Sequence, residues 1–349
     1  MASRVQLKLL SAAMAALMTC VMPTFARVGD IFNSRQSAAA PQASWRTSSQ
    51  ADTKIVTDGT GRSVAIPIHV QRVVSLAPNL TETVYALGLE DKLVGDTTYC
   101  DTPAAAKEKP HIGAPLTPSL EAIVALHPDL VLATAINRWE TVEAITKLGI
   151  PVYTVEPHTV RDMLQSISSL ADVMGAHEQG VALVAKLQGT LDNLQTGLRD
   201  KPLVHVLFVV WEDPLITIGQ NTFIADALRW SGAESVIISK QDWPQISMEE
   251  VLRLEPDYIV LTSNHSGTDD TDQVRDLRAR GVWNQIEAVR LGRIVVVGEE
   301  VTRPAPGLVE VIVQLARGLH PEIFGIEQKH SRLENRGWES DAGRLACVR

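Results

Sequence analysis

The chain has 349 residues, 45% of them hydrophobic, and a formal net charge of -9 at pH 7. Because single hydrophobic cores usually stop growing at about 250 to 300 residues, we expect two lobes. The acidic balance argues against a nucleic-acid-binding protein, since phosphate backbones are bound by clusters of Lys and Arg.

The first residues have the pattern of an export signal. Arg4 and Lys8 form a basic start, residues 9–21 are an apolar run, and small residues surround position 26. The run is too short to span a bilayer. We therefore predict a signal peptide over 1–26 and a periplasmic location, with a lipid anchor at Cys20 as an alternative.

Two polar segments are expected to lie outside the folded part. Residues 27–53 are rich in Ser, Ala, Gln and Arg without hydrophobic periodicity, which predicts a disordered tether, and residues 326–349 form a polar tail. The cysteines, Cys20, Cys100 and Cys347, are too widely spaced for a disulfide framework or a thiolate metal site. Whether Cys100 pairs with Cys347 stays open.

An internal repeat organises the folded part. SLEAIVALHPDLVLAT (119–134) and SMEEVLRLEPDYIVLT (247–262) are identical at six positions. Each copy predicts a Ser N-cap, a short amphipathic helix, a Pro-Asp turn that ends the helix, and a buried parallel strand. After each copy come a Leu-Gly pair and a β-branched strand, at 148–155 and 291–298, and the second copy contains an additional polar loop at 264–272.

The two halves also begin alike, with strands at 73–76 and 204–210 and helices that end near Gly88 and Gly232. We predict an α/β fold of two Rossmann-like lobes with parallel sheets, at 54–157 and 201–325. Residues 158–200 have helical apolar spacing interrupted near Gly175, so one long helix of about 20 residues after Gly175 should join the lobes.

Ligands of open α/β sheets bind at the carboxyl ends of the strands, so the loops that follow the strands are the candidate site. The first lobe offers Ala77, Pro78 and Tyr99 there, and the second lobe offers Trp211 and Trp243. Loop aromatics in a chain that is only 5% aromatic suggest flat contacts with a large ligand. Trp139 and Trp283 are expected to pack within the lobes.

Enzymatic motifs are absent from the sequence: it has no Gly-x-Ser-x-Gly elbow, no phosphate-binding Gly-Lys-Ser/Thr loop and no dinucleotide fingerprint. We therefore predict that the protein is not an enzyme. A distant alternative is a metallocluster protein or enzyme on the same architecture. Convergence of His111, His158 and His265 on a metal is a further alternative, although the prediction is no metal site.

Three segments carry a resemblance to a known family: RVVSLAPNLTETVYALG (72–88), the first repeat copy, and WPQISMEEVL (243–252). Together they resemble the helical-backbone class of periplasmic substrate-binding proteins, which serve ABC importers of cobalamin, haem and ferric siderophores. WPQ (243–245) and YCDTP (99–103) most resemble the cobalamin receptors of that class. The resemblance implies a monomeric two-lobed receptor for a corrinoid, with no resident cofactor.

The resemblance also implies roles for individual residues. Ligand contacts are expected at Tyr99, Trp211, Trp243 and Glu299, with Arg303 beside the pocket. The two acids at the second helical position of the repeat, Glu121 and Glu249, would pair with arginines of a dimeric permease. From the residues alone, a local role beside the positive end of the helix dipole is favoured.

Three positions depart from the cobalamin receptors, of which the first two bear on the ligand and the third only on stability. Pro115 stands in place of a Trp, Glu299 in place of an Asp, and Ser231 in place of a disulfide cysteine. The alternative ligands are haem, for which Tyr99 could ligate the iron, and a ferric siderophore, which usually needs more cations than Arg303 alone.

Overall fold

The computed structural model describes residues 52–263 and 270–324, which belong to one compact unit. The predicted signal peptide, Cys20, nearly all of the tether, Cys347 and the tail lie outside the described residues. The described chain begins with a hairpin of β1 (Thr53–Thr57) and β2 (Ser63–Pro67), so the last residue of the predicted tether already belongs to a strand. No helix of the described residues is long and apolar enough to cross a membrane.

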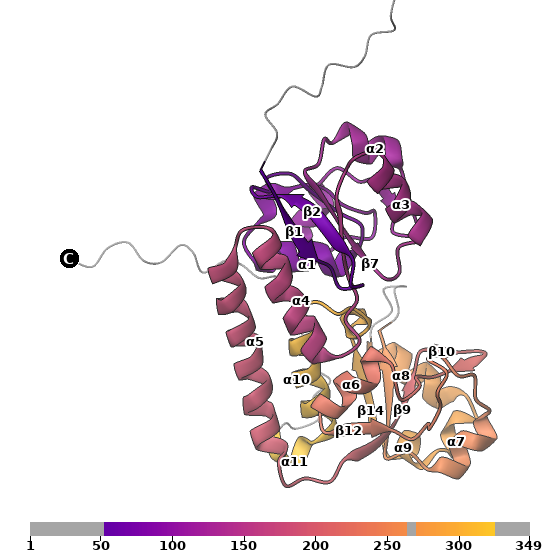
Figure 1. Cartoon of the computed structure of the whole chain (residues 1–349). Coiled ribbons are helices and arrows are strands. Elements are labelled where there is room, and N and C mark those ends of the chain that lie inside the picture. Colours follow the sequence, from indigo (N-terminus) through magenta and orange to yellow (C-terminus); the bar gives the residue numbers. More distant parts are fainter. Residues whose placement is uncertain (1–51, 264–269, 325–349) are drawn as a thin grey trace, which may run out of the picture. The chain divides into compact units, whose positions relative to one another are not determined.

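Each half of the chain builds a four-stranded parallel sheet (Figure 1). The first contains β3 (Val73–Ser75), β4 (Leu93–Gly95), β7 (Leu130–Thr134) and β8 (Val152–Val155), in the order β4-β3-β7-β8. The second contains β9 (Val204–Val209), β12 (Ala233–Ser235), β13 (Tyr258–Thr262) and β14 (Ile294–Val297), in the order β12-β9-β13-β14. Both sheets thus follow one topology, which confirms the two-lobed parallel fold predicted from the repeat.

The helices around the first sheet are α1 (Pro78–Ala86), α2 (Leu120–Ala125) and α3 (Trp139–Lys147). Those around the second are α6 (Phe223–Trp230), α7 (Met248–Leu254), α8 (Asp270–Ala279), α9 (Glu287–Arg290), α10 (Leu308–Leu319) and α11 (Pro321–Phe324). Short hairpins join β5 (Gly113–Ala114) to β6 (Thr117–Pro118) and β10 (Trp211–Glu212) to β11 (Leu215–Ile216). Because α8 begins at Asp270, the polar loop predicted over 264–272 is too long at its end; residues 264–269 lie outside the described part.

The repeated Ser and Asp have the same roles in both lobes. Ser119 accepts a hydrogen bond from the Ala122 amide at 3.2 Å. Its counterpart Ser247 caps α7 in the same way. Asp129 accepts from the amides of Gln71 and Arg72, both at 2.9 Å, and its counterpart Asp257 accepts from the amide of His205 at 3.0 Å. Each turn therefore fastens the end of one helix to the start of the neighbouring strand.

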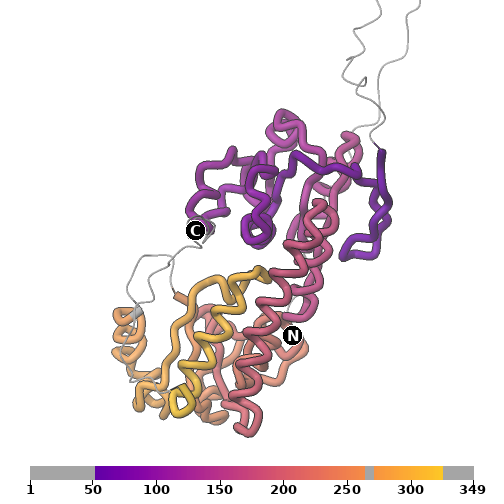
Figure 2. The backbone as a smooth tube through the Cα atoms, turned by 90° about the vertical axis from the view of Figure 1, so that its left-hand side faces the viewer, coloured from indigo at the N-terminus to yellow at the C-terminus, as the bar shows by residue number. Residues whose placement is uncertain are grey.

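The lobes are connected by α4 (Val160–Val173) and α5 (His177–Leu198). The break between them falls at Gly175, whose φ of +74° favours glycine. Figure 2 shows α5 beside α10 of the second lobe, and α5 also packs against α4. The predicted long connecting helix is thus present.

Side chains alternate across each sheet between two cores. Leu130 and Leu132 point to one face of the first sheet, and Phe208 and Val260 to one face of the second; all four belong to a single cluster that also contains the buried side of α4 and α5. The opposite faces form separate clusters, one in each lobe. The central cluster therefore runs through both lobes.

Of the two tryptophans predicted to pack within the lobes, one is buried. Trp283 is 4% exposed and lies in the cluster on the outer face of the second sheet. The prediction for Trp139 is wrong: it begins α3, is 57% exposed, and its ring lies 5.0 Å from the Arg62 guanidinium.

Candidate ligand-binding site

A cavity of about 660 Å³ lies between the lobes, at the carboxyl ends of β3, β7, β8 and β14. Its volume is within the ~300 to 1,000 Å³ typical of small-molecule sites. The first lobe supplies most of the wall, from the segments 78–79, 114–116, 134–136 and 155–158 together with Tyr99, and the second lobe supplies Glu299 and 302–304.

The wall is largely apolar where the first lobe forms it. Tyr99, Leu116 and Ile136 are each more than half exposed and all three line this cavity. Exposed apolar side chains gathered in one patch are typical of ligand-binding grooves. Pro115 also lines the cavity. These side chains can contact a flat apolar ligand surface.

The structure brings four of the predicted ligand contacts into this cavity: Pro78, Tyr99, Glu299 and Arg303. Ala77 precedes α1, is 0% exposed and is not among the residues that line this cavity.

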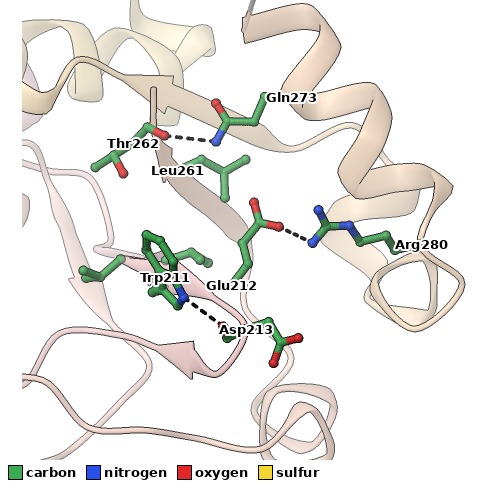
Figure 3. A pocket seen from close by; sticks show the side chains of 9 residues that line it. Trp211, Glu212, Asp213, Leu261, Thr262, Gln273 and Arg280 are labelled. Atoms are coloured by element: carbon green, nitrogen blue, oxygen red, sulfur yellow. Dashed lines mark hydrogen bonds and ion pairs between the residues drawn. The ribbon is translucent and has the colours of Figure 1, made fainter. Parts of the chain in front are cut away.

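The two predicted tryptophans of the second lobe lie elsewhere. Trp211 lines a smaller hollow of about 280 Å³ at the carboxyl ends of β9 and β13 (Figure 3). In that hollow its indole NH donates to the backbone oxygen of Asp213, and Glu212 pairs with Arg280. Trp243 is 52% exposed and lines neither hollow.

A charged cluster joins the two lobes beside the main cavity. One nitrogen of Arg303 lies 3.4 Å from Oε1 of Glu82 in α1 and 3.3 Å from Oδ1 of Asp101, and the other lies 3.8 Å from Oε2 of Glu299. Burial raises the pKa of Glu82 to about 7 against the opposing attraction of Arg303. Burial disfavours the charge of Arg303, but the carboxylates of Glu82 and Asp101 outweigh it and raise the pKa of the guanidinium.

Asn137 is a buried residue that was not predicted from the sequence and that holds the cavity loops in place. Its side-chain amide donates to the backbone oxygens of Leu76 and Pro115, at 3.1 and 2.9 Å, and its carbonyl accepts from the Thr134 amide at 2.8 Å. Thr134 itself lines the cavity, and its buried hydroxyl has no hydrogen-bond partner among the described residues. Thr134 ends the buried strand β7 and Asn137 follows in the turn after it, and this position at the carboxyl end of a strand is the signal that could have identified them.

The other candidate residues occupy separate positions. Glu121 and Glu249 are exposed at equivalent places in the first turns of α2 and α7. His111 pairs with Asp96 at 2.9 Å, His158 lines the cavity, and His265 lies outside the described residues.

Cys100 is a buried free thiol that is hydrogen-bonded to the hydroxyl groups of Thr81 and Thr97. Burial raises its pKa, so it is a poor nucleophile and metal ligand.

A family model described as "Periplasmic binding protein" matches residues 73–301. The chain belongs to this periplasmic binding protein family. The resemblance seen in the sequence is therefore confirmed, and the protein is a substrate-binding protein of the ABC-transporter class. Members of this family are substrate-binding proteins rather than enzymes.

Two relatives extend this match. The chain is 30% identical over 278 residues to an uncharacterized ABC transporter substrate-binding lipoprotein, YvrC, of Bacillus subtilis, covering 77% of this chain and 86% of the relative. It is 28% identical over 253 residues to the vitamin B12-binding protein of Vibrio parahaemolyticus, covering 70% and 88%.

Two solved structures have the same fold as this chain. The periplasmic vitamin B12-binding protein BtuF of Vibrio cholerae superposes with a TM-score of 0.65 at 25% identity, covering 73% of this chain and 98% of that one. A periplasmic heme-binding protein from Pseudomonas aeruginosa superposes with a TM-score of 0.64 at 24% identity, covering 73% and 94%. The likeness to the heme-binding protein shows the fold alone. Because proteins of this fold bind different ligands, membership of the family does not identify the ligand of this chain.

Proposed function

We propose that the protein is an extracytoplasmic receptor that delivers a cobalamin-like corrinoid to an ABC transporter. The observation that carries this proposal is the open cavity of about 660 Å³ between the lobes, with apolar walls and Tyr99 at its side. A ligand with broad flat faces can bury these exposed side chains. The 28% identity to a vitamin B12-binding protein supports the same ligand.

Delivery would depend on the two acids of the repeat. Glu121 and Glu249 are exposed, equivalent in position and carried one on each lobe, so a two-fold symmetric permease with basic pockets could engage both. In this proposal the receptor is a monomer that is exported by residues 1–26, and it makes or breaks no covalent bond.

A second candidate ligand is haem. Tyr99 and His158 both line the cavity, and either side chain is a known type of ligand for haem iron. A ferric siderophore is less favoured, because Arg303 is the one Arg or Lys among the described lining residues.

The deciding experiment is a titration of the purified mature protein with cyanocobalamin, haem and ferrichrome. Tryptophan quenching and calorimetry monitor the binding during the titration. We expect one-to-one binding of cyanocobalamin. Binding of haem or ferrichrome without binding of cyanocobalamin would overturn the corrinoid assignment and keep the receptor.

A further inference from the structure

The cavity between the lobes has an excess of negative charge. Glu156 and Glu299 line it, and Glu82 and Asp101 contact Arg303 at its edge. Among the described residues of the lining, Arg303 is the one Arg or Lys that opposes these four carboxyl groups. The remaining titratable side chains of the described lining are Tyr99 and His158, and His158 lies 3.8 Å from a Glu156 oxygen.

Arg303 already pairs with carboxylates of the protein. It lies within 4 Å of Glu82, Asp101 and Glu299, and its side chain is only 20% exposed. A ligand anion that took this guanidinium would draw it away from Glu82, whose side chain is 7% exposed, and breaking a buried pair is costly. The cation is therefore a poor anchor for an anionic ligand.

We infer that this cavity selects its ligand by charge, favouring a large flat ligand with a net positive charge over a neutral one and rejecting anions. The inference rests on the proposed function, because it takes this cavity as the ligand site. The apolar wall of the first lobe supplies contact area. The carboxylates of Asp101 and Glu299, which lie around Arg303 at the edge of the cavity, supply the discrimination between ligand charges.

The size of the effect follows from distance and screening. Charges separated by several ångströms at the mouth of a cavity interact through a medium intermediate between water and protein, so we expect about a threefold to tenfold change in affinity per unit of ligand charge. The Debye screening length falls to about 3 Å at 1 M salt, so most of the difference in affinity between the charged ligands should then disappear.

The test uses three corrinoids that differ at one peripheral amide and carry a zero, negative or positive charge there. Cyanocobalamin is neutral; converting one peripheral amide to a carboxylate adds a negative charge, and converting the same amide to an aminoethyl amide adds a positive charge. Cobalt keeps its cyanide in all three, so coordination by His158 does not distort the comparison. Calorimetry at low and high salt should give the order cationic, neutral, anionic at low salt and nearly equal affinities at high salt.

Variants locate the effect. Asp101→Asn removes one exposed carboxylate from the edge of the cavity. It should reduce the ratio of cationic to anionic ligand affinity about threefold. A purely structural defect would instead weaken the binding of all three ligands equally. Glu178→Gln removes another exposed carboxylate, on α5 and outside the cavity lining, and should leave the ratio of cationic to anionic ligand affinity unchanged.

The outcomes separate this inference from the corrinoid assignment. Equal affinities at low salt, or tightest binding of the carboxylate, would overturn charge selection while the corrinoid assignment stands. If no corrinoid binds, the assignment fails and charge selection is tested with ferrioxamine B, ferrichrome and haem as the cationic, neutral and anionic ligands. Binding of haem alone, or failure of every cationic and neutral ligand in both sets, would overturn it.

Discussion

The guanidinium of Arg303, which follows the last strand of the second lobe, lies 3.4 Å from the carboxylate of Glu82 in the first helix of the first lobe. This contact joins residues 221 positions apart in the chain. It lies beside the candidate ligand cavity, so the charged pair that bridges the lobes also contributes to the electrostatics of the site.

The buried carboxyl of Glu82 should make stability depend on pH. Its folded-state pKa of about 7 lies above the ordinary value of 4.5, so the folded chain holds the proton more tightly than the unfolded chain does. Stability is therefore highest below pH 4.5 with respect to this group, and falls as pH rises towards about 7. The full loss is on the order of 3 kcal/mol, since one pKa unit corresponds to about 1.4 kcal/mol.

Glu82→Gln should remove this dependence, because the amide keeps an acceptor for Arg303 without a buried charge. We expect its melting temperature to exceed that of the parent at pH 8 and to approach it near pH 4.5. Glu310→Gln, an exposed acid on α10, is the control. Parallel pH profiles for the parent and Glu82→Gln would show that Glu82 is not the titrating group.

Asn137→Ala should destabilise the protein and weaken ligand binding together. It removes three hydrogen bonds and leaves the buried backbone oxygen of Leu76 without this donor, at about 1 to 3 kcal/mol for each unsatisfied group. Thermal unfolding and the titration with cyanocobalamin measure the two effects. Asn137→Asp, which keeps the size but cannot donate to both carbonyls, should behave alike; a melting temperature within about 1 °C of the parent for both variants would contradict this role.

Thr134→Val should separate binding from stability. The hydroxyl of Thr134 is buried without a partner among the described residues, so its replacement by a methyl of the same shape should leave the melting temperature unchanged or raise it. If the ligand supplies the missing partner, affinity should fall about fivefold. An unchanged dissociation constant for the preferred corrinoid would mean that the hydroxyl does not contact the ligand.

The permease contacts can be tested by a double substitution. Glu121→Ala with Glu249→Ala should abolish or strongly reduce uptake in cells and leave ligand affinity unchanged, since neither residue lines the cavity. The matched control is Glu108→Ala with Glu310→Ala, which removes two other exposed acids. Normal uptake by the Glu121 and Glu249 variant would exclude these residues as docking points.

Local sequence patterns predicted the fold because they describe short-range physics. Ser119 and Ser247 cap their helices, Gly175 ends one, and the β-branched runs form strands buried on both faces. Each of these features depends on neighbours within a few residues, and therefore appears in the sequence itself.

The site was only partly predictable because it depends on how the lobes meet. Tyr99 and Arg303 enter the cavity as the family resemblance implies, while Trp211 and Trp243 do not. Nothing local indicates that Arg303 will meet Glu82, or that Asn137 will reach the loop at Pro115. The predicted burial of Trp139 was wrong for a similar reason. A helical pattern identifies the apolar face of a helix, but it does not show whether another element covers the first turn.

The hydrophobic cluster that contains Leu132, Leu191 and Phe208 is continuous through both lobes and the connecting helix. Neither lobe can lose its half of this cluster without exposing apolar surface of the other, so the two lobes should melt in a single calorimetric transition. A destabilising change in one lobe should then lower the working population of the whole receptor, and selection on either lobe acts on both.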